Sequence, residues 1–167
     1  MTARPIRLLG DPILRTQCDA VTTFDAELRG LVTDLMDTLF ADEGRAGVAA
    51  PQIGVDARVF VYKAGDQVGH LINPSIVVGE ERQGGDEGCL SLPGLYFPTP
   101  RAERVVARGV DMHGEPLTIE GDGFLARALQ HEADHLDGRL YVDTLTGDVR
   151  RQALRAIRSA PWAAPTR

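Results

Sequence analysis

Residues 130–138, which read Gln-His-Glu-Ala-Asp-His-Leu-Asp-Gly, carry the most specific pattern in the chain. They contain His131-Glu132-Ala133-Asp134-His135, an H-E-x-x-H motif, within a predicted helix that starts at Asp122 as its cap and runs to Gly138. Residues four apart on a helix share a face, so both imidazoles can reach one divalent ion while Glu132 borders the same site. Two histidines facing solvent are the plain alternative. The spacing favours a helix that carries a metal site.

The identity of a third ligand separates the enzyme classes that use this motif. A catalytic metal of this type takes three protein ligands and keeps one position for water. Tyr141 stands where the metzincin pattern needs a histidine, and neither Glu nor His follows His135. The third ligand is therefore a downstream aspartate or an upstream residue. Upstream, the best candidate is Cys89, because thiolate binds zinc or ferrous iron strongly and neighbouring Gly88 permits close approach.

A third segment, Gly47-Val48-Ala49-Ala50-Pro51-Gln52, follows the first predicted helix. Its small residues permit another chain to come close, and the Gln52 amide can donate to a developing oxyanion. Taken alone, the segment is equally compatible with a tightly packed buried turn. The remaining scarce reactive residues have no such neighbours, and we assign structural or surface roles to Cys18, His70 and His113.

Outward from these segments, the periodicity predicts an α+β fold. Apolar residues at three- and four-residue spacing between Leu28 and Phe40 predict an amphipathic helix, with Thr22 or Thr23 as candidate cap. Apolar runs bounded by Gly, Pro and Asn predict strands at 59–62, 71–78, 105–112 and 116–120, with a hairpin turn at 113–115. A last helix is predicted over about 149–158. Strands in series with separate helices indicate antiparallel sheets around the central helix that carries H-E-x-x-H.

Length and charge bound the class of protein. With 167 residues and 18.1 kDa, 1–167 is expected to form one domain. Two cysteines exclude a disulfide framework, and a net charge of −6 excludes a surface built for direct DNA binding. We expect a cytoplasmic protein without membrane contact, because the chain lacks a secretory signal and an apolar run of roughly 20 residues.

Positive charge gathers at the C-terminus. All 24 acidic residues lie at or before Asp148, and five arginines follow it. An amphipathic helix with a solvated arginine face is the plain interpretation of this basic helix and tail, residues 149–167. Docking on an anionic partner such as ribosomal RNA is the sharper one.

Together the three motif segments resemble the peptide deformylase family, in its bacterial, iron-dependent form. The family patterns are G-x-G-[LV]-A-A-x-Q, E-G-C-L-S and Q-H-E-x-D-H-L-x-G, and the last two stand complete at 87–91 and 130–138. The N-terminal segment 5–15 is also similar, so the resemblance covers about residues 4–146. One departure is Arg45, which stands where the family has the first glycine of G-x-G.

The resemblance implies a role for each matching residue. It implies an Fe2+ ion, for which Zn2+, Ni2+ or Co2+ can substitute, on Cys89, His131 and His135. Glu132 becomes the general base, and the Gln52 side chain and the Leu90 backbone N–H stabilise the oxyanion. The substrate is an N-formylmethionyl peptide or nascent chain. The products are formate and a peptide with a free N-terminal amine. Backbone pairing to that peptide is expected from Gly47, Val48 and Gly88.

Further positions follow less directly from the same resemblance. An apolar pocket for the methionine side chain is expected from Val48, Phe124, Ala128 and His131. Glu87 and Gln130 flank ligands, and one or the other is expected to orient them.

Three alternatives stay open on the sequence. One is a small H-E-x-x-H metallopeptidase, which gives no reason for Glu87 to Ser91. Another is a deformylase-like enzyme acting on a different formyl or acyl group, which Arg45 keeps open because it changes the cleft rim. The third is a regulatory module in which a fourth protein ligand closes the metal site.

Overall fold

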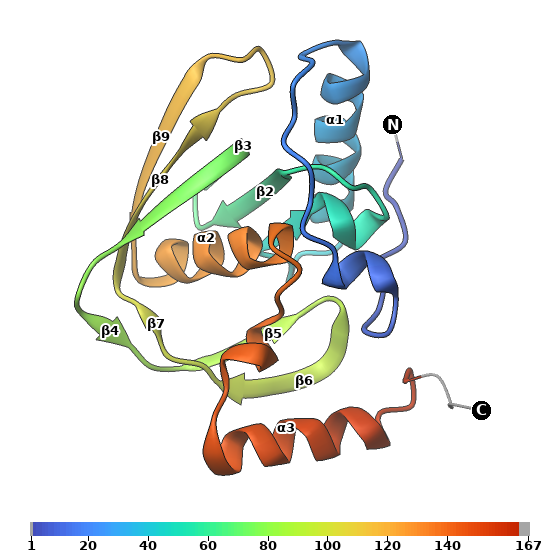
Figure 1. The fold of residues 1–167 in the computed structure, drawn as a ribbon, viewed down its shortest axis with the longest axis vertical. Helices are drawn as coiled ribbons and strands as arrows, with labels where there is room; N and C mark the ends of the chain where they lie inside the picture. The colour runs from blue at the N-terminus through green and yellow to red at the C-terminus, as the bar shows by residue number, and fades with distance from the viewer. Residues whose placement is uncertain (1, 164–167) are drawn as a thin grey trace.

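The computed structural model describes residues 2–163, and Figure 1 shows their arrangement. These residues form three α-helices, nine strands and three short 3-10 helices (η). In chain order the elements are η1 (Pro12–Arg15), α1 (Ala26–Phe40), β1 (Gly47–Ala49), η2 (Ala50–Ile53), β2 (Val59–Ala64), β3 (Gln67–Val78), β4 (Arg82–Gln83), β5 (Asp86–Cys89), β6 (Leu92–Pro98), β7 (Arg101–Ala102), β8 (Arg104–Val110), β9 (Pro116–Asp122), α2 (Gly123–Leu136), η3 (Tyr141–Thr144) and α3 (Gly147–Ser159).

The strands form three antiparallel sheets, which confirms the predicted α+β class. The largest has the order β1-β2-β3-β8-β9, and two-stranded sheets join β4 to β7 and β5 to β6. In this order β1 is an edge strand of the large sheet, and β5 pairs with β6 alone. Both strands therefore keep one open hydrogen-bonding edge.

Strand β2 explains how the large sheet holds two helices. Side chains alternate between the faces of a strand, so Val59 and Val61 point to one side and Phe60 and Tyr62 to the other. The first pair packs against α1, and the second pair packs in the cluster that holds α2. Because both faces are covered, the four residues Val59–Tyr62 are all buried, which accounts for their continuous apolar sequence.

The boundaries of several elements differ from the predictions. Helix α1 is capped by Asp25, whose Oδ1 accepts from Leu28 N at 3.0 Å, so the expectation of a Thr22 or Thr23 cap was wrong. An ionised carboxylate at this position also suits the positive end of the helix dipole. Strand β3 begins earlier than predicted, at Gln67, because its first residues pair with β2 in a hairpin.

Helix α2 lies at the centre of the molecule, between the large sheet and the β5–β6 hairpin (Figure 1). Asp122 is its N-cap residue as predicted, and the chain leaves the helix through Gly138 in the left-handed region at φ 73°. A Cβ at Gly138 would lie 2.7 Å from the backbone carbonyl carbon of Arg15. Only glycine fits here, because the position needs both a positive φ and close approach of another backbone.

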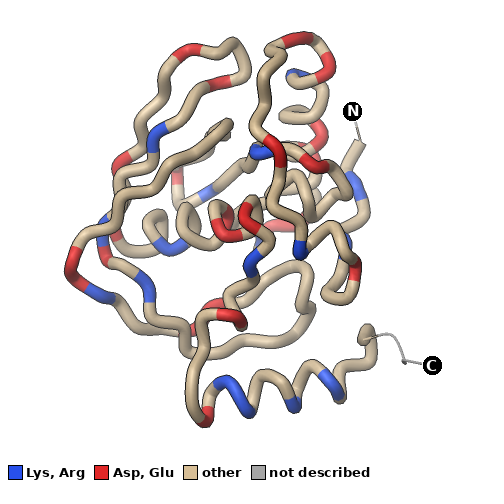
Figure 2. The backbone as a smooth tube through the Cα atoms, viewed as in Figure 1, with Lys and Arg blue, Asp and Glu red and all other residues tan. Residues whose placement is uncertain are grey.

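Helix α3 closes the side of the molecule below β6. Its buried Ala153 packs with Leu92 and Tyr141 in a third apolar cluster, and the Trp162 indole donates to Pro93 O at 2.8 Å. Figure 2 shows basic residues along the outer part of this helix, and their side chains are exposed. Among the described residues, no helix has the length and apolar character needed to cross a bilayer.

A buried ion network joins β5, β7 and α2. Glu87 on β5 accepts from Arg101 Nε at 2.9 Å and Nη2 at 2.7 Å, and from Arg127 Nη1 at 2.8 Å. Arg101 also pairs with Asp134 on α2 at 2.8 Å. Burial by itself raises the pKa of Glu87, but hydrogen bonds from Arg101 and His131 outweigh it and hold the pKa at about 2. Glu87 is therefore an ionised buried carboxylate that fixes three elements.

Replacing this carboxylate tests the network. Glu87→Gln leaves Arg101 and Arg127 without their shared counter-charge, so we expect the free energy of unfolding to fall by about 3 kcal/mol at pH 7. The folded pKa of about 2 lies below the ordinary 4.5, so this stabilisation is complete above pH 4.5 and is lost as the pH falls towards 2. Urea unfolding of both proteins across this range should show their stability difference narrowing.

The matched control is Asp34→Asn, which removes the exposed ion pair between Asp34 and Arg4. Exposed pairs contribute about 1 kcal/mol or less, so this variant should change stability little. Equal losses in the two variants, or a Glu87→Gln difference that is independent of pH, would contradict a special role for Glu87.

Candidate metal centre

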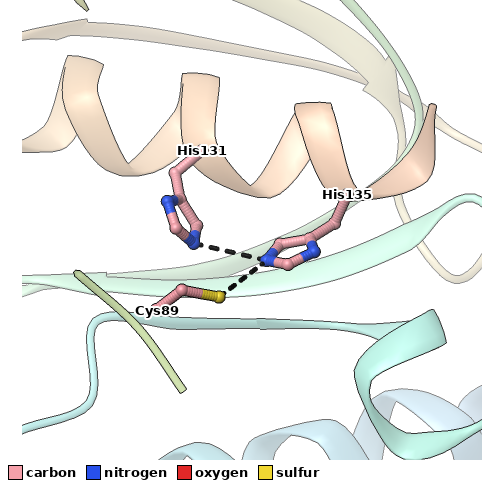
Figure 3. A group of neighbouring side chains, drawn as sticks. All are labelled: Cys89, His131 and His135. Atoms are coloured by element: carbon pink, nitrogen blue, oxygen red, sulfur yellow. Dashed lines mark hydrogen bonds between the residues drawn. The ribbon is translucent and has the colours of Figure 1, made fainter. Parts of the chain in front are cut away.

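Three side chains from two separate elements converge, one from β5 and two from α2 (Figure 3). Cys89 comes from the end of β5, and His131 and His135 come from successive turns of α2. Cys89 Sγ lies 3.4 Å from His135 Nε2, and the Nε2 atoms of the two histidines are 3.3 Å apart. Among the described residues, this is the group of Cys, His and acidic side chains whose donor atoms all lie within 4.8 Å of one another.

Hydrogen bonding orients His131 towards this cluster. Its Nδ1 lies 2.5 Å from Glu87 Oε2, and since Glu87 is ionised, the Nδ1 carries the proton and donates. This contact turns Nε2 towards Cys89 and His135. Sequence reasoning expected Glu87 to orient a ligand, and the contact matches that expectation.

The surroundings of the two imidazoles shift their pKa values in opposite directions. Burial lowers the pKa of His131, but the neighbouring Cys89 thiol group and Glu87 outweigh it and raise the pKa well above its ordinary value. Burial and the positive charge of His131 lower the pKa of His135. A cation bound by both Nε2 atoms would displace a proton, so metal affinity should rise with pH.

The donor set fits a borderline divalent metal ion. One sulfur and two imidazole nitrogens match zinc or ferrous iron and are a poor match for magnesium or calcium, which prefer oxygen. Two polar atoms beside the cluster, Glu132 Oε1 and His135 Nδ1, are buried and have no hydrogen-bond partner among the described residues. Three protein ligands with a polar neighbour indicate a catalytic rather than a closed structural site.

Tyr141, Cys18 and His70 lie outside the group of three candidate ligands. Tyr141, at the position of the metzincin histidine, stacks near the His131 ring with centroids 6.2 Å apart and donates its hydroxyl to Leu95 O at 3.0 Å. Cys18 is buried, which raises the pKa of its thiol to about 11. His70 is half-buried rather than on the surface, and its Nε2 accepts from Met112 N at 3.0 Å.

Glu132 is buried beside the cluster and lies against Gly47. It is 3% exposed, and this burial raises its pKa to about 7. A Cβ at Gly47 would lie 2.7 Å from the Glu132 Cδ. The glycine on β1 therefore makes room for the carboxylate on α2.

The Gln52 side chain is fixed at both ends. Its Oε1 accepts from Ala49 N at 3.0 Å, while its Nε2 donates to Ser91 Oγ at 3.1 Å and lies 3.7 Å from Cys89 Sγ. The Gln52 amide is thus aimed at the three candidate ligand side chains. Leu90, which follows Cys89, lines the same cleft as Gln52. Sequence reasoning missed Ser91, although it lies within E-G-C-L-S.

A cleft of about 670 Å³ runs between β1 and β5 and contains Gly47, Gly88, Cys89 and Glu132 in its walls. Lys63 N donates to Ala46 O at 2.8 Å, and hydrogen-bonded positions alternate along an antiparallel ladder. The backbone groups of Gly47 therefore point to the open edge of β1. The open edges of two strands thus face the same cleft.

Val48 does not reach this cleft, which corrects the expectation that it contacts substrate. Its side chain is fully buried in the cluster with α1, and by the same alternation its backbone faces Val61 on β2. Of the expected methionine pocket, Phe124, Ala128 and His131 line the cleft. Of the two residues expected to orient a ligand, Glu87 makes the contact, whereas the Gln130 side chain bonds the backbone of Ala102 and Ala126.

Arg45 has no strained backbone, since Asn73 is the one non-glycine residue with positive φ in the described chain. Its Nη1 donates to Thr38 O at 2.7 Å in the last turn of α1. A cation is favourable at this negative end of a helix. The arginine also lines the cleft, so its effect is on the cleft wall rather than on the backbone.

Comparison with known proteins agrees with this geometry. The family model for polypeptide deformylase matches residues 3–151. A peptide deformylase of Acidothermus cellulolyticus is 57% identical over 166 residues, which cover 99% of this chain and 92% of the relative. A peptide deformylase of Parafrankia is 56% identical over 98% of this chain and 90% of the relative. The crystal structure of peptide deformylase from Thermus thermophilus superposes with a TM-score of 0.88 at 40% identity, covering 95% of each chain. The chain therefore belongs to the peptide deformylase family, hydrolases that remove the N-formyl group from newly made peptides.

Proposed function

We propose that Cys89, His131 and His135 hold one divalent metal ion and that the cleft beside them hydrolyses the formyl amide of N-formylmethionyl peptides. The observation that carries this assignment is the convergence of three metal-ligating atoms beside a buried carboxylate, in a cleft walled by two open strand edges. We further propose that residues 1–167 act as one catalytic domain.

The metal is ferrous iron in this proposal, and Zn2+, Ni2+ or Co2+ can substitute for it. The thiolate and imidazole donors support this group of ions. When bound, such an ion supplies a Lewis acid that lowers the pKa of water to about 7 and polarises the formyl carbonyl.

Glu132 acts as general base in this scheme. Its carboxylate accepts a proton from the attacking water and passes it to the leaving amine as the carbon–nitrogen bond breaks. The products are formate and a peptide with a free amino terminus. Contact with Gly47 on the cleft wall holds the carboxylate next to the open edge of β1.

Two donors stabilise the oxyanion that forms at the formyl carbon. They are the Gln52 Nε2, fixed by Ala49 and Ser91, and the backbone N–H of Leu90. Donors that are already oriented gain strength in a buried site because they need no reorganisation during the reaction.

The peptide substrate lies in the cleft as an added strand. Gly47 on β1 and Gly88 on β5 offer backbone groups from opposite walls. Recognition through backbone hydrogen bonds tolerates many side chains, which suits an enzyme that must process nascent chains of every sequence. The side chain of the formylated methionine contacts Phe124, Ala128 and His131.

Removing the proposed base tests the mechanism. Glu132→Ala should lower the kcat for formate release from formyl-Met-Ala-Ser by about 100-fold or more, because Glu87, the other carboxylate next to a proposed ligand, is already held by Arg101, Arg127 and His131. Its metal content should stay near one ion per chain, since the three ligands are untouched. Formate assay and metal analysis on the same preparation check both points; near-normal turnover would exclude Glu132 as base.

The ligand assignment is tested through the two cysteines. Cys89→Ser should lose most of its bound metal and activity, because a neutral hydroxyl is a weak ligand. Cys18→Ser is the matched control: it removes the other thiol, outside the cluster, and should keep its metal. Equal metal content in the two variants would overturn the role of Cys89.

We also propose that the enzyme works in the cytoplasm and docks on the ribosome through α3. The support is the charge of this helix: Arg150, Arg151, Arg155 and Arg158 are all exposed, whereas Ala153 faces the core. Arg167, the fifth arginine of the expected basic tail, lies outside the described residues. An exposed basic helix face suits phosphate-rich RNA, with affinity that falls as salt rises.

Charge neutralisation tests this docking without disturbing the core. Replacing the four exposed arginines of α3 by glutamine should reduce co-sedimentation with ribosomes about tenfold or more and leave formate release from a short peptide unchanged. The matched control replaces four exposed arginines elsewhere, namely Arg29, Arg82, Arg104 and Arg108. Equal sedimentation of the two variants would leave α3 as a solvated helix.

A further inference from the structure

Arg45 lines the cleft with a positive charge that forms no ion pair within the described residues. Three arginines line the cleft. Arg4 pairs with Asp34 and Arg127 pairs with Glu87, whereas Arg45 forms no ion pair with any described residue. The one side-chain hydrogen bond of Arg45 within that part of the chain runs from Nη1 to Thr38 O, at 2.7 Å. A guanidinium has five N–H groups, so most of its donors remain for another partner.

The guanidinium is held in place before any substrate arrives. The bond to Thr38 O ties it to the C-terminal turn of α1, where the helix dipole favours a cation. The Nε atom is buried and has no hydrogen-bond partner among the described residues. An anchored cation loses little side-chain entropy when it pairs, which makes it more selective than a freely moving surface arginine.

The geometry of β1 fixes the direction in which a bound peptide runs. Ala49 and Ala50 are fully buried, and Ala49 N is already bonded to Gln52 Oε1. A peptide therefore cannot continue past the inner end of the strand. The cleft instead continues along Ala46 and Arg45. A peptide whose formyl end lies near Glu132 must leave the site past Arg45.

Spacing along a strand identifies the peptide residue that meets this charge. Gly47 contacts Glu132, so the formylated methionine lies beside Gly47. Consecutive strand residues are about 3.3 Å apart, and Arg45 lies two residues from Gly47. The third residue of the peptide therefore lies beside Arg45.

We infer that Arg45 is a specificity-determining residue that favours an acidic side chain at the third position of the formylated peptide. This inference rests on the proposed function, because it assumes that the formyl group is bound beside Glu132. It adds a side-chain preference to recognition that otherwise uses backbone groups. Asp86, exposed on the opposite wall, gives the competing expectation of a basic side chain.

The test compares peptides that differ at one position. Formate release is measured from formyl-Met-Ala-X-Ala-amide with X as Asp, Asn or Lys, the amide removing the terminal carboxylate. The wild type should show a kcat/KM for Asp about fivefold above that for Lys, with Asn between, and this ratio should shrink as salt rises to about 0.5 M. In Arg45→Ala the ratio should fall to about one, whereas Arg45→Lys should retain a preference for Asp.

Two controls separate this inference from stability effects. Arg29→Ala, which removes an exposed arginine of α1 outside the cleft, should keep the wild-type ratio. Moving the Asp to the second peptide position should abolish the dependence on Arg45. Because each ratio is taken within one enzyme, loss of folded protein cancels.

The outcomes are distinct. A wild-type preference for Lys, no preference, or the same ratio in Arg45→Ala would overturn the inference while leaving deformylation intact. No formate from any of the three peptides would instead overturn the proposed function.

Discussion

The pairing of Glu87 with two arginines and a histidine is the constraint to which both the fold and the site are coupled. A buried carboxylate is tolerated only where hydrogen bonds and opposite charges replace its lost hydration. Arg101 on β7 and Arg127 on α2 meet that need, and His131 contributes a third partner. Cys89 follows Glu87 by two residues on the same strand, so the interaction that stabilises β5 against α2 also sets the sulfur opposite the imidazoles.

Helix α2 combines two demands that normally conflict. A central helix has to be buried, yet five buried residues of this one are polar or charged: Arg127, Gln130, His131, Glu132 and His135. The first two are hydrogen-bonded to neighbouring backbone and carboxylate groups. Two buried side-chain atoms of α2 have no hydrogen-bond partner in the described chain, Glu132 Oε1 and His135 Nδ1. Both belong to residues at the candidate metal site. The polar atoms of α2 that are buried without a hydrogen-bond partner are thus found at the candidate metal site.

In the proposed binding mode, two open strand edges account for a breadth of peptide substrates, and the charge of Arg45 narrows it. Edge strands are usually protected because they attract other chains. Here the edges of β1 and β5 line the same cleft, where we propose that they pair with one extended peptide. Arg45 adds a fixed charge to one wall of the cleft, away from the three candidate metal ligands. From there it can select among substrates without altering those ligands.

The sequence alone determined the parts that depend on local spacing. Two histidines four apart on a helix share a face in any fold, and the periodic and continuous apolar runs specified α1, β2 and α2 to within about three residues at each end. Tertiary structure decided which side chains meet across long separations. The Glu87–Arg127 pair, the Gln52–Ser91 contact and the orientation of Arg45 towards Thr38 leave no local pattern. It also decided that Val48 faces the core and Gly47 the cleft, because strand register and edge position arise only when β1 pairs with β2.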